Sequence, residues 1–90
     1  MANPIHATLQ ADVVATITLD RDARKVNVCN VTGTAAVWFT LDGSTPEVEG
    51  NGSWVLPAVV SAIDLEPSTA GPTVVKLISE GTPTVSVGAI

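Results

Sequence analysis

The chain has 90 residues, of which 46% are hydrophobic and only 14% are charged. A chain of this length supports one hydrophobic core, so we predict a single domain over residues 1–90, with residues 1–9 as an N-terminal arm or edge strand. With four basic residues in all and a net charge of −5, the chain carries too little positive charge to displace the counterions of DNA or RNA, which argues against nucleic acid as its partner.

Short runs rich in valine, isoleucine and threonine alternate between apolar and polar residues, which is the period of a half-buried β-strand. No segment has the apolar spacing of a helix. In chain order, the expected strands are residues 5–9, 13–19, 24–31, 35–41, 53–56, 59–65, 73–79 and 84–89. Seven or eight short strands separated by turn residues predict an all-β fold, either an Ig-like β-sandwich or a small barrel of antiparallel strands.

The alternation also predicts which side chains face the core. In the strand 35–41, Val37, Phe39 and Leu41 form the inward set, and Trp38 points the other way. In the strand 13–19 the inward set begins at Val13 and continues through Ala15, Ile17 and Leu19. We expect the last two strands, 73–79 and 84–89, to close as a pair around the turn residues 80–83.

A turn follows the strand 35–41. Asp42 and Gly43 favour positive φ, and Pro46 lacks a backbone donor, so residues 42–46 interrupt the sheet. The segment from Val37 to Pro46 resembles a hallmark of the Ig-like C-terminal module of chitobiases and related glycosidases, in which an aromatic pair precedes Thr-x-Asp-Gly-Ser-x-Pro. This resemblance covers about ten residues and implies an Ig-like sandwich without implying an activity.

Residues that carry catalytic or metal chemistry are sparse. The single histidine, His6, and the single cysteine, Cys29, are better interpreted as strand residues than as a catalytic base and a reactive thiol. One Cys and one His cannot complete a structural zinc site. Two acidic pairs, Asp20 with Asp22 and Glu47 with Glu49, lack the long acidic loop of a calcium site. The segment 50–52, Gly-Asn-Gly, lacks the helix that completes a phosphate loop. We therefore predict no enzyme, no metal and no cofactor.

The low charge has a further consequence, because charged residues normally make up ~25% of a soluble domain. We infer that part of the surface faces protein rather than water. Three of the four basic residues, Arg21, Arg24 and Lys25, lie close together and form one basic corner. This corner is an ordinary solvated turn, a site of polar stacking between copies of the chain, or a docking site for an acidic surface.

Residues 1–10 lack the basic start and apolar run of a signal peptide. The longest apolar stretch, residues 53–63, contains Pro57 and is shorter than the ~20 residues of a membrane span. We therefore expect a protein made in the cytoplasm, without a membrane span. With Cys29 alone, no intrachain disulfide is expected.

In length and style the whole chain resembles small β-domain virion proteins of tailed bacteriophages that infect actinobacteria. The similarity rests on the Val/Thr/Ala-rich strands, the turn at residues 42–46 and the segment from Val74 to Pro83. It implies a capsid decoration or minor capsid protein, bound to the major capsid protein on the virion exterior and assembled as a homo-oligomer, with a trimer favoured. The alternatives are a phage tail component and an Ig-like glycan-binding module.

Large aromatic side chains are enriched at interface hot spots and also stack on sugar rings. Trp38 and Trp54 are therefore the first candidates for an interface, with core packing as the alternative for each. Together with Arg21, Arg24 and Lys25 they form the predicted interface set.

Overall fold

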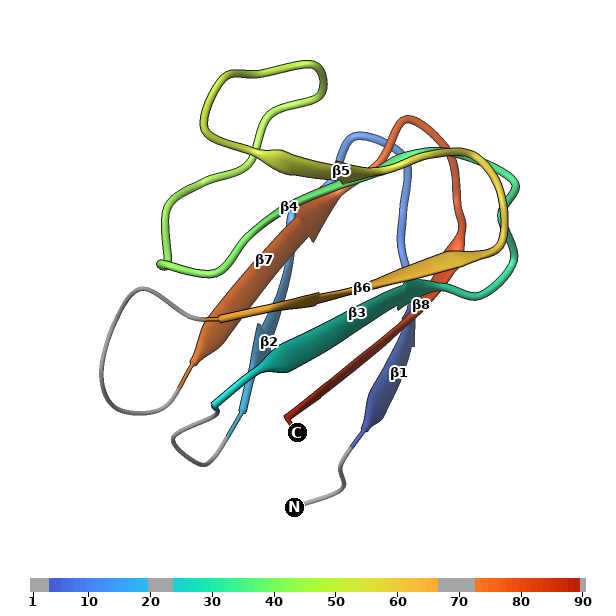
Figure 1. Ribbon diagram of the computed structural model, residues 1–90. Coiled ribbons are helices and arrows are strands. Elements are labelled where there is room, and N and C mark those ends of the chain that lie inside the picture. Colours follow the sequence, from blue (N-terminus) through green and yellow to red (C-terminus); the bar gives the residue numbers. More distant parts are fainter. Residues whose placement is uncertain (1–3, 20–23, 67–72, 90) are drawn as a thin grey trace.

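The computed structural model describes residues 4–19, 24–66 and 73–89. These residues form two four-stranded sheets that lie face to face (Figure 1). The prediction of an all-β sandwich of seven to eight antiparallel strands is confirmed. The strands are β1 (Ile5–Thr8), β2 (Ala15–Thr18), β3 (Val26–Asn30), β4 (Val37–Thr40), β5 (Trp54–Leu56), β6 (Ser61–Leu65), β7 (Val74–Ile78) and β8 (Thr84–Ala89).

The strand order is β1-β8-β3-β6 in one sheet and β2-β7-β4-β5 in the other. Every connection crosses from one sheet to the other except the one between β4 and β5, which pair directly. This is the order of an eight-stranded jelly roll. An immunoglobulin constant domain instead pairs its first two strands within one sheet, so the sandwich is confirmed but its strand order is not the immunoglobulin order. β1 is an edge strand of its sheet and lies within the segment 1–9, of which the structure describes residues 4–9.

The expectation that the last two strands pair with each other is wrong. β7 lies between β2 and β4, whereas β8 lies between β1 and β3 in the other sheet. Residues 79–83 therefore link the two sheets rather than turning a hairpin. Alternation within a strand fixes which side chains face the core, but it carries no information about which strand lies alongside.

The core lies between the sheets and consists mainly of valine and leucine with one phenylalanine. Val37 and Phe39 are completely buried and Leu41 is nearly so, which confirms the inward set of β4. The remaining buried apolar side chains in the described residues are Leu9, Ile17, Leu19, Val26, Val28, Leu56, Val75, Leu77, Val85 and Val87.

The prediction that Val13 faces the core is wrong, because its side chain is 51% exposed. β2 begins only at Ala15, and Val13 lies in a turn in which its amide donates to the Gln10 carbonyl. Asp12 in that turn has a positive φ of 59°. The apolar side chain is therefore placed outside the sandwich, although it fits the period of the strand.

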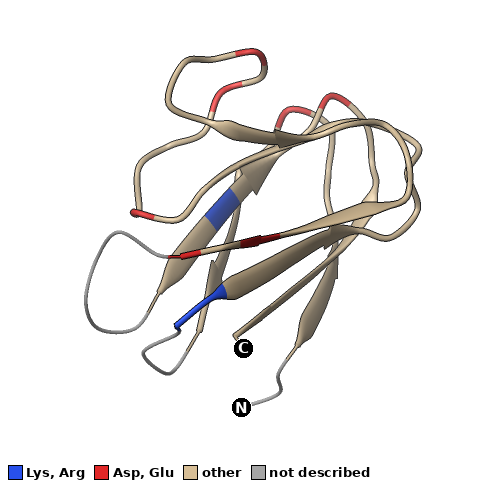
Figure 2. Cartoon of the chain, in the orientation of Figure 1, with Lys and Arg blue, Asp and Glu red and all other residues tan. Residues whose placement is uncertain are grey.

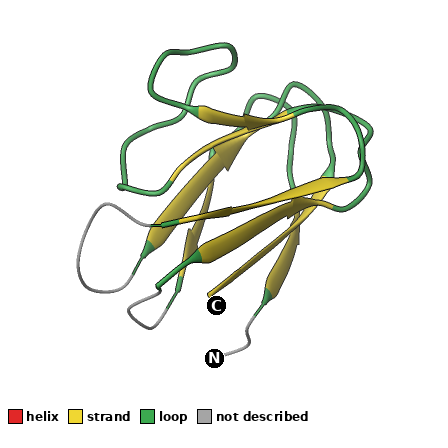
Figure 3. Cartoon of the chain, viewed as in Figure 1, coloured by secondary structure: helices red, strands yellow, loops and turns green. Residues whose placement is uncertain are grey.

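Four connections gather at one end of the sandwich, which we call the loop end: residues 9–14, 31–36, 57–60 and 79–83 (Figure 1). The start of β1 and the end of β8 lie at the opposite end. Figure 3 shows that strands and loops make up the described chain. None of its segments is a helix with the length and apolar character needed to cross a membrane.

Candidate functional site

The loop end is held together by a buried asparagine. Asn30 has no exposed surface, and its Nδ2 donates to the carbonyls of Ala35 (2.9 Å) and Pro57 (3.0 Å). Its Oδ1 accepts the amide of Gly33 at 3.1 Å. One side chain thus links the loop after β3 to the loop after β5, and burial makes these hydrogen bonds costly to break.

Ser79 likewise links loops of the loop end to one another through hydrogen bonds. It is also fully buried, and its Oγ donates to the Ala36 carbonyl (2.7 Å) and accepts from the Gly81 amide (3.2 Å). The Ser79 carbonyl accepts the amide of Asp12 at 2.8 Å. Together, Asn30 and Ser79 cross-link all four loops, so the surface that these loops present is fixed in shape.

Gly33 allows two of these loops to approach each other closely. Its φ is +66°, and a Cβ at this position would lie 2.4 Å from the backbone nitrogen of Val60 and 2.6 Å from the carbonyl carbon of Val59. A side chain therefore has no room here. The close approach positions residues 59 and 60 against the loop after β3.

Three exposed valines lie on the surface whose shape Asn30 and Ser79 fix. Val60 is 70% exposed, Val59 56% and Val31 43%. The pairing of β3 with β6 stops at Asn30 and Ser61, the last residue of β3 and the first of β6. Val31 follows Asn30 in the chain, and Val60 precedes Ser61. We call Val31, Val59 and Val60 the valine patch; Val13 is exposed at the same end.

The two loops that carry the valine patch, residues 31–36 and 57–60, contain no charged residue. Figure 2 shows the charged positions of the described chain elsewhere, with the acidic ones mainly in the other loops and on β6. An uncharged apolar surface on a rigid frame is typical of a protein contact site.

A hollow of about 240 Å³ lies at the edge of the loop end and is lined by Ala35, Ala36, Trp38, Glu49 and Glu80. Trp38 is half-buried and points outward from β4, between Val55 of β5 and Ile78 of β7. The two carboxylates come from different loops. We call this the Trp38 hollow.

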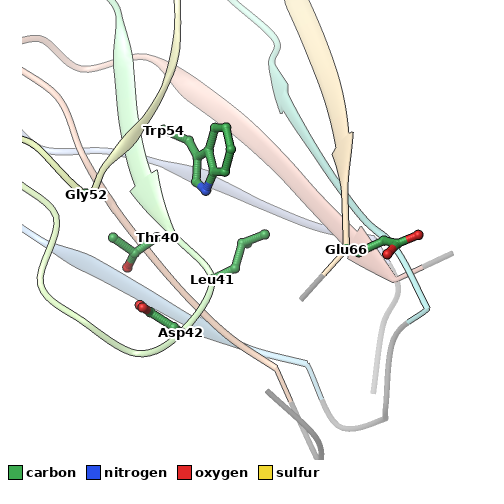
Figure 4. A pocket seen from close by; sticks show the side chains of 6 residues that line it. All are labelled: Thr40, Leu41, Asp42, Gly52, Trp54 and Glu66. Atoms are coloured by element: carbon green, nitrogen blue, oxygen red, sulfur yellow. The ribbon is translucent and has the colours of Figure 1, made fainter. Parts of the chain in front are cut away.

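A second hollow, of about 200 Å³, lies beside Trp54, whose side chain is 53% exposed. Figure 4 shows the indole ring of Trp54 over this hollow, with Leu41 between Asp42 and Glu66. Asp42 and Glu66 therefore line the hollow from different sides. Trp54 lies opposite Phe39 in the register, but β5 is an edge strand, so its ring remains accessible.

Asp42 is fixed by the turn that the sequence predicts. The hydroxyl of Ser44 donates to its Oδ1 at 2.5 Å and the amide of Ser44 does so at 3.0 Å. These two hydrogen bonds stabilise the carboxylate and lower the pKa of Asp42 below its ordinary value of 3.8. Gly43 has a φ of +82°, as expected for this turn.

The structure does not gather the predicted interface residues into one surface. Trp38 and Trp54 line separate hollows. Arg24 and Lys25 are exposed just before β3, at the end opposite the loop end, and Arg21 lies outside the described residues. Sequence reasoning missed the valine patch because Val59 and Val60 fit the alternation of the following strand. The signal available was an uncharged Pro57-Ala58-Val59-Val60 segment.

The residues considered for catalysis lie on the flat outer face of the sheet β1-β8-β3-β6. His6 pairs with Ser86, and Ser86 pairs with Cys29 on its other side. Two strand spacings, about 10 Å, thus separate the backbones of His6 and Cys29, whereas a nucleophile and its base must lie within about 3 Å.

In the described part of the chain, no three His, Cys, Asp or Glu side chains come together as a metal site. Of the two acidic pairs considered for calcium, Asp20 and Asp22 lie outside the described residues. Both members of the other pair, Glu47 and Glu49, are exposed, and of the two only Glu49 lines the Trp38 hollow.

No protein-family model matches the chain, and no curated protein matches it in sequence. Among solved structures, a de novo designed double-stranded β-helix is similar over 99% of this chain and 100% of its own, with 13% identity and a TM-score of 0.59. A family two carbohydrate esterase from Cellvibrio japonicus is similar over the whole of this chain and 30% of its own, with 12% identity and a TM-score of 0.51. At such identities these likenesses concern the fold alone.

Proposed function

We propose that this protein is a non-enzymatic docking module that binds a larger protein assembly through its loop end. The observation that carries the proposal is the valine patch, an exposed apolar surface that Asn30 and Ser79 hold in a fixed shape. A preorganised surface loses little conformational freedom on binding, so more of the favourable free energy of burial appears as affinity.

The hydrophobic effect supplies the driving force. Completely burying a valine side chain contributes on the order of 1.5 kcal/mol, and the three valines of the patch have much of that burial still to gain. The two loops that carry the valine patch add no charge that would have to be desolvated, and the carboxylates of Asp12 and Glu80 lie in the other two loops of the loop end. A contact of this kind is specific when it belongs to an interface of about 1,600 Å² in total.

Within this class, we propose a capsid decoration protein that binds the outer surface of a major capsid shell as a homo-oligomer, with a trimer favoured. The proposal that the partner is a capsid shell rests on the resemblance of the sequence to small virion proteins of actinobacteriophages. Multiple copies clamping neighbouring shell subunits would add their contacts around a closed particle. Jelly rolls occur in viral capsid domains among others, and this fold-level association agrees with the proposal without carrying it.

The experiment is a binding assay with two matched variants. Val60→Asp places a carboxylate in the valine patch, and Thr18→Asp places the same group on an exposed residue of β2, away from the loop end. If the protein decorates a capsid, phage particles purified from infected host cells should each carry hundreds of copies of the wild-type chain. Stripped particles should rebind wild type and Thr18→Asp, but not Val60→Asp. A handful of copies per particle, or undiminished rebinding of Val60→Asp, would reject the proposal.

A second candidate function, glycan binding, is favoured by Trp54. Its ring is exposed over an open hollow that also presents the carboxylates of Asp42 and Glu66. An accessible indole stacks on a sugar ring, and carboxylate oxygens accept hydrogen bonds from sugar hydroxyls. On a glycan array, the wild type should bind and Trp54→Ala should not, with Trp38→Phe as the control. An array without a response would dispose of this candidate.

A further inference from the structure

The Trp38 hollow combines three kinds of surface in a small space. It is lined by the half-buried Trp38, by the small side chains of Ala35 and Ala36, and by the exposed Glu49 and Glu80. The described residues that line it include no lysine or arginine. An indole and two carboxylates that line one hollow attract a cation in two ways, through the ring quadrupole and through ionic attraction.

The hollow is also fixed in shape. Ser79 Oγ holds the Ala36 carbonyl at 2.7 Å, and the same oxygen accepts the amide of Gly81, next to Glu80. The loop that supplies Glu80 is thereby joined to Ala36. Val55 and Ile78 are the cross-strand neighbours of Trp38 on either side, so its backbone is held in the middle of three paired strands.

From this arrangement, we propose that the Trp38 hollow receives the cationic head of an arginine or lysine side chain from the protein on which the module docks. This inference rests on the proposed docking function and adds the chemistry of the partner. The hollow adjoins the loop end, so an apolar partner surface that meets the valine patch would present a basic residue beside it. Arginine fits best, because its planar guanidinium stacks on an indole while donating to carboxylates.

Nuclear magnetic resonance of the two indole N–H groups tests the inference directly. The protein is labelled with ¹⁵N, and Trp38→Phe and Trp54→Phe assign the two signals. The probe is a hexa-arginine peptide, compared with a hexa-citrulline peptide of the same shape without charge. We expect the Trp38 signal to shift in a saturable manner with arginine, to remain unchanged with citrulline, and to respond less as the salt concentration rises.

Variants separate the hollow from general attraction to an acidic protein. The double variant Glu49→Gln/Glu80→Gln should weaken binding of the arginine peptide by about tenfold, because both carboxylates of the site are lost. Glu47→Gln removes a neighbouring charge from the same loop as Glu49 without touching the hollow. It should change the affinity by less than about twofold.

Equal shifts with citrulline, an equal loss in Glu47→Gln, or a Trp38 shift produced by an oligosaccharide instead of the arginine peptide would overturn the inference. If the protein self-associates and Lys25→Gln abolishes this, the Lys25 side chain of a second copy fills the hollow. That result would overturn the claim that the cation comes from a different protein. The docking function is measured separately, by the Val60→Asp assay. A failed titration with intact docking therefore removes the cation site alone, and failed docking with an intact titration removes the proposed function alone.

Discussion

Two glycines with positive φ provide a controlled test of how the loop end is built. Gly33 and Gly43 have φ values of +66° and +82°. A Cβ at Gly43 would meet nothing within 4 Å, whereas a Cβ at Gly33 would lie 2.4 Å from the backbone nitrogen of Val60. The substitutions Gly33→Ala and Gly43→Ala therefore impose similar backbone strain, and only the first adds a steric clash.

The strain common to both is about 1–2 kcal/mol, the cost of a left-handed conformation for an L-residue. Restriction of the unfolded chain offsets about 0.4–1 kcal/mol of it in each case. Gly43→Ala should therefore lower the free energy of unfolding by roughly 0–1.6 kcal/mol. At Gly33 the clash is with backbone atoms, which move only if the whole loop 57–60 moves, and forcing extra volume into a packed site costs about 1–3 kcal/mol more.

Thermal unfolding followed by circular dichroism measures the difference. In a domain of this size, 1 kcal/mol corresponds to about 4–8 °C in Tm. Gly33→Ala should therefore melt at least about 5 °C below Gly43→Ala, and it should bind particles more weakly because Val59 and Val60 are displaced. Equal melting temperatures would refute the claim that the loops after β3 and β5 are in close backbone contact.

Three further changes test other parts of the structure. Phe39→Ala, in the completely buried centre of the core, should lower the free energy of unfolding by about 3–5 kcal/mol; a loss below about 1 kcal/mol in denaturant titrations would place Phe39 outside the core. Among the described residues the Thr73 hydroxyl is buried without a hydrogen-bond partner, so Thr73→Val should leave stability unchanged or raise it by about 1 kcal/mol, and a marked decrease would reveal a partner. Ser44→Ala should raise the pKa of Asp42 toward 3.8 in a carboxyl-carbon titration, because Ser44 lowers that pKa. Asp42 stabilises the fold above its unfolded pKa and loses this effect as the pH falls through the lowered folded value. An unchanged Asp42 titration would contradict the turn geometry.

The sequence predicts the strands of this fold better than it predicts their partners. Val37, Phe39 and Leu41 face the core as expected, because alternation follows from backbone geometry alone. The pairing of the last two strands could not be obtained in this way, since β7 and β8 each pair with strands remote in sequence. Such pairing depends on long-range packing that a local pattern does not encode.

The candidate site was harder to predict because it is built where alternation stops. Val59 and Val60 continue the apolar pattern of β6 but precede its first residue, Ser61. Their exposure is decided by Gly33 and Asn30, which lie about 30 residues earlier in the chain and hold the loop after β5 in place. Trp38 points away from Val37 and Phe39, as alternation predicts, but the pattern left open whether it lay on an outer face or in a second core. The carboxylates beside it come from loops whose approach no local pattern indicates.

The two ends of the jelly roll differ in a way that sets an orientation for docking. The loop end presents the valine patch and the Trp38 hollow, while the described ends of the chain, at the start of β1 and the end of β8, lie at the other end (Figure 1). Arg24 and Lys25 are also on that side. A module bound by its loop end would therefore direct Arg24, Lys25 and the described ends of the chain away from the partner. A fluorescent domain fused after Ile90 should then leave particle binding intact, whereas the same domain inserted between Val59 and Val60 should abolish it. Abolition by the C-terminal fusion alone would mean that the module docks in the reverse orientation, with the loop end facing solvent.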